Sequence, residues 1–180
     1  MKKTIKSSLL FAAVLLTVLA TIAQAQSTQT SQPSYKDMVV ENPDAEADMK
    51  VVGDFVNSLV SGDLDKAKSL MSENYKEYGP APTDSSTAEQ TISSWQENYK
   101  TQSNRKVGFV TQTFRVLSGN LKGDWVSLWG NYSFTQDGKE ISFPFQLTSL
   151  VTDGKIDTEQ IYYDRMYIFQ TLGYKLLPPE

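Results

Sequence analysis

Four stretches rich in Val, Phe, Thr, Tyr and Trp fill the second half of the chain, at about residues 106–117, 123–135, 140–152 and 156–167. Three short sequences that are typical of hairpin turns separate them: Ser118-Gly119-Asn120, Gln136-Asp137-Gly138 and Thr152-Asp153-Gly154. Connections this short join antiparallel neighbours, because parallel strands need a long crossover. The pattern therefore predicts a four-stranded antiparallel meander.

Three helices are predicted before these strands, from apolar residues that recur three and four positions apart. The first helix ends at Gly62, and Asp63 can cap a second, shorter one. A short strand is expected at 74–78, and Thr87-x-x-Gln90 fits the capping box of the third helix. Helices followed by a meander predict an α+β domain with the helices packed on one face of the sheet.

The N-terminus has the three parts of a secretory signal peptide. Three early lysines precede an apolar run from Leu9 to Ala20, and Ala23-Gln24-Ala25 is a small-x-small triplet. The run is too short for a spanning helix. We therefore expect removal of residues 1–25, a flexible linker over 26–43 and one domain over 44–180. The protein would be secreted or periplasmic, with no membrane association after cleavage.

The composition excludes several kinds of chemistry. Because the chain has no cysteine and no histidine, disulfides, thiol nucleophiles, histidine-containing triads and ordinary zinc sites are ruled out. Any acid–base catalyst must be Asp, Glu, Tyr or Lys with a shifted pKa. The net charge is −4 and the longest basic cluster is Arg105-Lys106, so a nucleic-acid partner is not expected. Asp63 and Asp65 are explained as a helix cap and an acidic first turn, and we expect no metal and no cofactor.

Four short stretches, in this order and spacing, resemble the nuclear transport factor 2-like superfamily and, within it, the SnoaL-like group. They are Gly62-Asp63-Leu64-Asp65, Gly123-Asp124-Trp125-Val126, Asp153-Gly154-Lys155-Ile156 and the tail from Tyr163 to Gly173. The resemblance implies a cone-shaped fold, in which three N-terminal helices pack on a curved, mainly antiparallel sheet around a pocket. It leaves the function open, because members include isomerases, dehydratases and polyketide cyclases as well as binding modules without catalysis.

The acidic residue that cyclases of this kind use is missing from its expected place. The stretch that resembles their His-Trp-Asp is Glu159-Gln160-Ile161, and Ile161 cannot transfer a proton. Asp164 is the carboxylate left nearby, among several aromatic residues. It is either an acid/base whose pKa an apolar pocket raises or a structural carboxylate bonded to a neighbouring cation or to backbone.

Aromatic residues recur along the predicted helix and strand faces. Period-two alternation places Trp129 and Tyr132 on opposite faces of one strand. The rings either fill the core or form a pocket wall with a few hydroxyls, suited to a flat apolar ligand. The candidate ligand-binding residues are Trp95, Tyr99, Trp129, Tyr132 and Tyr163.

Two function classes follow from these residues. The favoured one is a secreted SnoaL-like domain that binds a small apolar molecule without catalysis. The alternative is a histidine-free isomerase, dehydratase or cyclase that uses Asp164 as acid/base, so whether the protein is an enzyme stays open at this point. A homodimer is also expected, because the proteins it resembles commonly pair through the convex sheet face and residues 107–116 carry apolar side chains on both sides.

Overall fold

One curved, seven-stranded sheet organises residues 33–177, the part of the chain that a computed structural model describes. The strand order is β1-β4-β5-β6-β7-β2-β3. Its centre is the antiparallel meander of β4 (Ser103–Val116), β5 (Gly123–Gln136), β6 (Lys139–Thr152) and β7 (Lys155–Tyr163). The predicted meander is confirmed, although β4 starts earlier and β7 ends earlier than expected.

Two of the three predicted turns are tight, two-residue hairpins. Asp137 and Gly138 have φ angles of 50° and 72°, and Asp153 and Gly154 have φ angles of 51° and 70°. Positive φ at both central residues gives the turn a twist that matches the twist of its strands, and Asp-Gly adopts this conformation readily. These turns fix the register of β5 with β6 and of β6 with β7.

Three further strands extend the sheet. β2 (Met71–Tyr78), which contains the strand expected at 74–78, lies parallel to β7, and β3 (Ser85–Thr87) lies antiparallel to β2. At the other edge, β1 (Val39–Val40) lies antiparallel to β4. The parallel pairing of β2 with β7 brings a strand from the helical half of the chain next to the end of the meander.

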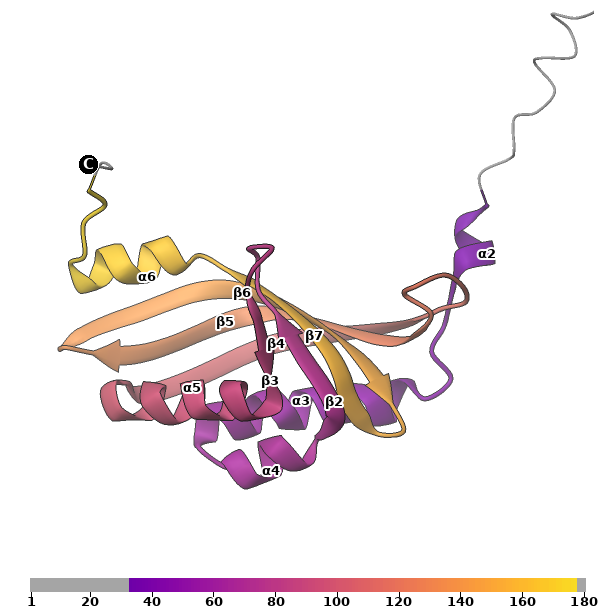
Figure 1. The fold of residues 1–180 in the computed structure, drawn as a ribbon, viewed down its shortest axis with the longest axis horizontal. Coiled ribbons are helices and arrows are strands. Elements are labelled where there is room, and N and C mark those ends of the chain that lie inside the picture. The colour runs from indigo at the N-terminus through magenta and orange to yellow at the C-terminus, as the bar shows by residue number, and fades with distance from the viewer. Residues whose placement is uncertain (1–32, 178–180) are drawn as a thin grey trace, which may run out of the picture. The chain divides into compact units, whose positions relative to one another are not determined.

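Helices lie at the three predicted places: α3 (Ala45–Ser61), α4 (Leu64–Ser69) and α5 (Ala88–Thr101). Gly62 ends α3 in the left-handed conformation, the Asp63 side chain caps α4, and Thr87 forms the reciprocal capping box with Gln90. In Figure 1, these three helices lie together on one side of the curved sheet.

The described residues also form two helices that were not predicted, α2 (Tyr35–Met38) and α6 (Arg165–Leu172), so the expected set of three is incomplete. The last strand was expected to continue to 167. It ends at Tyr163 because Asp164 caps α6, with its side chain accepting a hydrogen bond from the backbone N–H of Tyr167 (2.9 Å).

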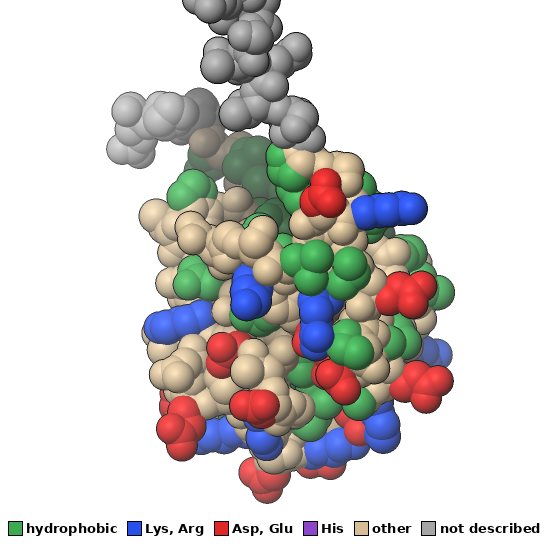
Figure 2. Space-filling view, turned by 90° about the vertical axis from the view of Figure 1, so that its right-hand side faces the viewer, with side chains coloured by type: hydrophobic (Ala, Val, Ile, Leu, Met, Phe, Trp, Pro, Cys, Tyr) green, Lys and Arg blue, Asp and Glu red, His purple; other side chains and the backbone are tan. Residues whose placement is uncertain are grey.

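The core lies between α3 and the inner face of the sheet. Val52 and Phe55 of α3 are fully buried, as are Val126 and Leu128 of β5 and Ile141 of β6. Outside the core, acidic and basic side chains are interspersed on the face shown in Figure 2, without a continuous basic stripe. None of the helices in residues 33–177 is long and apolar enough to cross a membrane.

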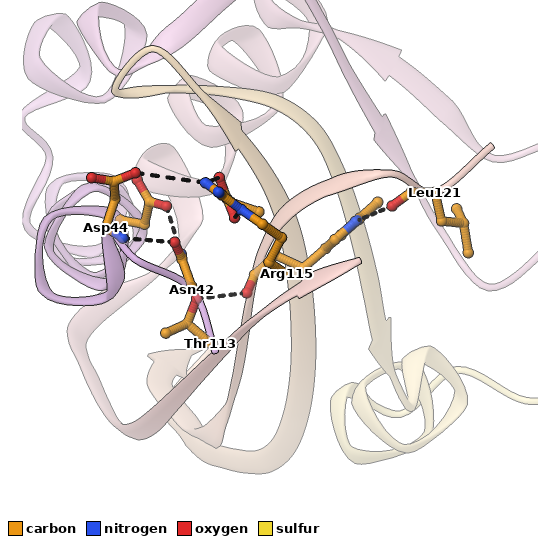
Figure 3. A network of polar contacts seen from close by, with 8 residues as sticks. Asn42, Asp44, Thr113, Arg115 and Leu121 are labelled. Atoms are coloured by element: carbon orange, nitrogen blue, oxygen red, sulfur yellow. Dashed lines mark hydrogen bonds and ion pairs between the residues drawn. The ribbon is translucent and has the colours of Figure 1, made fainter. Parts of the chain in front are cut away.

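A polar network fixes the chain in front of α3 to the sheet (Figure 3). Asn42 is 5% exposed, and its side-chain amide donates hydrogen bonds to Asp48 Oδ2 (2.7 Å) and to Thr113 Oγ1 (2.9 Å). Nearby, Arg115 contacts both carboxylate oxygens of Asp124 at 2.6 Å. The segment around Asn42 is therefore held in place by buried hydrogen bonds as well as by β1.

The domain boundaries predicted for the N-terminus fall partly outside the described residues. The predicted signal peptide, 1–25, lies wholly outside them. Of the linker predicted at 26–43, residues 35–43 carry α2, β1 and Asn42 with its hydrogen bonds.

Candidate functional site

A cavity of about 570 Å³ lies between the helices and the inner face of the sheet. Cavities of this size hold small molecules and cofactors. α5 contributes Trp95 to its wall, β5 contributes Tyr132, β6 contributes Phe143, and α6 contributes Ile168 and Leu172. The unpredicted helix α6 is thus part of the wall.

Aromatic rings in mutual contact form most of one side of this cavity. The ring of Tyr132 lies 5.9 Å from Trp95, 5.5 Å from Phe134 and 5.8 Å from Phe143, measured between centroids. Tyr163 stacks on Phe143 at 5.5 Å. Such pairs are worth about 0.5–1.5 kcal/mol beyond the area they bury, so the rings hold each other in place as a preformed wall.

The hydroxyl of Tyr132 is tied back into the protein. It donates a hydrogen bond of 2.8 Å to Gln102 Oε1, and burial raises the pKa of the Tyr132 phenol. Tyr132 therefore stays neutral and presents its ring, more than its hydroxyl, to the cavity.

Two carboxyl groups form a polar end to the cavity. Glu77 of β2 and Glu159 of β7 are paired neighbours across the two parallel strands, and both line the cavity. Glu159 is 1% exposed, and its Oε2 accepts a hydrogen bond of 3.5 Å from Ser149 Oγ. Glu77 accepts a similarly long hydrogen bond of 3.4 Å from Thr91 Oγ1.

Burial sets the protonation of this pair. It raises the pKa of the Glu159 carboxyl well above its ordinary value, and the nearby charge of Glu77 raises it further. Burial also raises the pKa of Glu77, against smaller lowering effects from the Thr91 and Tyr75 hydroxyls and the Arg165 charge. Two adjacent carboxylates cannot both ionise cheaply, and the more deeply buried Glu159 is the one that keeps its proton.

The Tyr75 hydroxyl lies beside these two carboxyl groups. Tyr75 is 2% exposed, and burial and the charges of Glu159 and Glu77 raise its pKa. Among the described residues, its hydroxyl is the one buried side-chain polar atom that makes no hydrogen bond of good geometry, although both carboxyls lie close to it. The polar end of the cavity thus holds an unsatisfied hydroxyl as well as two weakly bonded carboxyls.

Arg165 is the cation among the described residues that line the cavity. Its guanidinium lies 3.2 Å from Asp84 Oδ2 and 5.9 Å from the ring centroid of Tyr163. It is thus held between a carboxylate outside the cavity and an aromatic ring at its edge. No three Asp or Glu side chains within residues 33–177 are grouped as a metal site would require.

The candidate ligand-binding residues are not all brought together. Trp95, Tyr132 and Tyr163 line the cavity. Tyr99 packs behind Trp95 at 6.0 Å, with its hydroxyl donating to the Leu59 carbonyl. Trp129 lies on the other face of β5, is 44% exposed and does not line the cavity.

The carboxylate that the sequence singled out lies elsewhere. Asp164 is exposed, caps α6 and is not part of the cavity wall. Ile161, the residue at the expected acid position, does line it. Asp164 was the predicted acid, and Glu159 is instead the carboxyl that is buried at the cavity. Alternation along β7 places Glu159, Ile161 and Tyr163 on one face.

Solved structures with the same arrangement of elements were found by comparison. No family model matches the sequence, and no curated protein matches it. A candidate polyketide cyclase from Xanthomonas campestris superposes with a TM-score of 0.58 at 13% identity, covering 71% of this chain and 98% of its own. The fold is nuclear transport factor 2-like.

Two other structures share this nuclear transport factor 2-like fold. A candidate SnoaL-like polyketide cyclase from Shewanella denitrificans has a TM-score of 0.56 at 11% identity, over 69% of this chain and 96% of its own. A protein of ketosteroid isomerase-like fold from Catenulispora acidiphila, in complex with trimethylamine, has a TM-score of 0.56 at 15% identity. The match covers 72% of this chain and 98% of its own. At these identities the likeness establishes the fold and not an activity.

Proposed function

We propose that the protein is a secreted or periplasmic binding domain whose cavity takes a small, mainly apolar molecule without catalysing a reaction. The observation that carries the proposal is the preformed aromatic wall around Tyr132, in a cavity of about 570 Å³. Burying one large ring against a ligand is worth roughly 1.5–3 kcal/mol. A few such contacts support micromolar binding without any charged anchor.

The proposed absence of catalysis is supported by the two positions at which the sequence predicts an acid. Ile161 occupies the position at which the cyclases that the sequence resembles carry an acid, and Asp164 is bonded to the backbone of α6 on the surface. The signal-peptide pattern supports export. Intact-mass measurement of the exported protein should then give a mature chain that starts at Gln26.

A second candidate function is the isomerase, dehydratase or cyclase that the sequence left open. The observation in its favour is the pair of buried Glu159 and half-buried Glu77, which would replace Asp164 as the acid/base. Incubating 4-phenyl-2-butanone in D₂O with the protein distinguishes the two functions. A binding domain leaves deuterium exchange next to the carbonyl at the buffer rate. Exchange that Glu159→Gln abolishes would identify an enzyme.

We also propose a homodimer that buries the outer face of the sheet. Val110, Trp129, Gln146 and Tyr162 lie side by side across β4, β5, β6 and β7. The Val110 side chain is 55% exposed, and those of Trp129 and Tyr162 are each 44% exposed. The next row across the same strands is also uncharged: Gln112, Ser127, Thr148 and Gln160. Uncharged surface with exposed aromatic rings is typical of an interface.

A further inference from the structure

The cavity has two chemically different ends. At one end the faces and edges of Tyr132, Phe143 and Tyr163 make an aromatic wall. At the other end, Glu77 and Glu159 are adjacent on paired strands and line the same cavity. Tyr163 links the ends, because it shares one face of β7 with Glu159 and stacks on Phe143.

Within residues 33–177, the two carboxyl groups have no strong partner. Their hydrogen bonds, from Ser149 and Thr91, are 3.5 and 3.4 Å long. Arg165, the nearby guanidinium, contacts Asp84 at 3.2 Å. Buried carboxylates are retained in proteins when a cation or several good hydrogen bonds compensate for lost hydration.

A separate observation at the same place also indicates a missing ligand. The Tyr75 hydroxyl is buried beside both carboxyls and makes no hydrogen bond of good geometry to any described residue. A buried polar group without a partner costs free energy, so its retention needs an explanation. A cationic ligand group at the carboxyls would also be attracted by the lone pairs of this hydroxyl oxygen.

We infer that the ligand is an organic cation, an amine or quaternary ammonium head on an apolar body, with the head at Glu77 and Glu159 and the body against the aromatic wall. The inference rests on the proposed binding function and names the ligand class for it. A cation is attracted both by carboxylates and by the faces of aromatic rings, and the cavity offers the two together.

Binding of such a cation is coupled to the proton on the carboxyl pair. The groups that face the pair are Tyr75 on its own sheet, Thr91 of α5, Ser149 of β6 and Arg165 of α6. Before binding, Glu159 holds a proton because it is buried next to Glu77. The positive charge of the ligand favours the ionised form, so the protein releases this proton on binding.

Two probes of the same shape and different charge test the inference. Benzyltrimethylammonium carries a permanent positive charge, and neopentylbenzene is its neutral carbon analogue. The exported, mature protein is titrated with each at pH 7. We expect the cation to bind at least about tenfold more tightly. Because this cation has no acidic proton, any proton released comes from the protein, and calorimetry in phosphate and in Tris detects it as a buffer-dependent enthalpy.

Amide variants locate the effect. Glu77→Gln and Glu159→Gln together should abolish the preference for the cation and the proton release, while neopentylbenzene binds as before. Glu73→Gln, an exposed position on the same strand β2, is the matched control and should change neither. If circular dichroism shows that the double variant does not fold, the inference is tested on the unmodified protein alone. The relative affinity of the two probes and the buffer dependence of the enthalpy then decide whether a cation is preferred.

The possible failures are distinguishable. Equal affinity for both probes, without proton release, overturns the cation inference and leaves the binding proposal standing. The same holds if 4-phenyl-2-butanone binds better than the cation and weakens as the pH rises, because a neutral Glu159 would then be donating to a carbonyl. If no probe binds, the proposed function itself is wrong.

Discussion

Glu77 and Glu159 occupy paired positions on the parallel strands β2 and β7, and both side chains line one cavity. Parallel pairing places residues from distant parts of the chain side by side on the same face of the sheet. Here it places two carboxyl groups where at most one can ionise at low cost. The polar end of the cavity is therefore a product of topology and not of a local motif.

The first prediction concerns stability and pH. The pKa of Glu159 is raised in the folded state, so between its ordinary value and the raised value the folded protein binds a proton that the unfolded chain does not. Stability therefore falls as pH rises through this window, by up to about 1.4 kcal/mol per pH unit. Glu159→Gln should be more stable than the unmodified protein at pH 8, and its stability should vary less with pH.

Urea unfolding at pH 5 and pH 8 measures this effect, and Glu73→Gln is again the control. A Glu159→Gln variant that is less stable at pH 8, with an unchanged pH dependence, would show that Glu159 is ionised and stabilised in the folded protein.

The second prediction compares two tryptophans. Trp95 lines the cavity and contacts Tyr132, whereas Trp129 lies on the outer face. Trp95→Ala should weaken neopentylbenzene binding about ten- to a hundredfold, since it removes a ring from the wall. Trp129→Ala should leave the affinity within twofold. Calorimetric titration of both variants tests this, and the opposite order would place the binding site on the outer face.

The third prediction concerns Asp164. Its carboxylate caps α6 through Tyr167, so Asp164→Ala should lower the free energy of unfolding by about 1 kcal/mol. Affinity for neopentylbenzene should change little, because the carboxylate lies outside the cavity wall. Denaturation and titration of the same variant separate the two effects. Unchanged stability with lost binding would instead assign Asp164 to the ligand.

The fourth prediction tests the proposed interface. Trp129 lies at the centre of the uncharged outer face, next to Val110 and Gln146. Trp129→Lys places a charge there and should convert a homodimer into a monomer, because a buried unpaired charge is costly. Light scattering at micromolar concentration gives the mass of both proteins. A monomer mass for the unmodified protein would exclude the dimer.

Local sequence patterns predicted the local structure well. The caps at Asp63 and Thr87 and the end at Gly62 each depend on residues within one helical turn. The Asp-Gly turns at 137–138 and 153–154 depend on two residues that accept positive φ. Such signals need no knowledge of the rest of the fold, which is why they could be read from the sequence.

The site could be predicted only in part, because it depends on contacts between distant residues. Trp95, Tyr132 and Tyr163 were expected in a pocket and do line the cavity. The pairing of β2 with β7, which defines the polar end, has no local signal. Alternation placed Trp129 and Tyr132 on opposite faces of one strand, so both could not line the same cavity. The same rule, applied to residues 159–163, places Glu159 on the face that carries Ile161 and Tyr163.

The most direct test of the account is to locate an apolar probe on the protein. Nuclear magnetic resonance of isotope-labelled protein with neopentylbenzene measures contacts between the probe and individual side chains. The account predicts contacts to the rings of Tyr132, Phe143 and Trp95, with saturable binding. Absence of binding up to the solubility of the probe, or contacts confined to the outer face around Trp129, would contradict it.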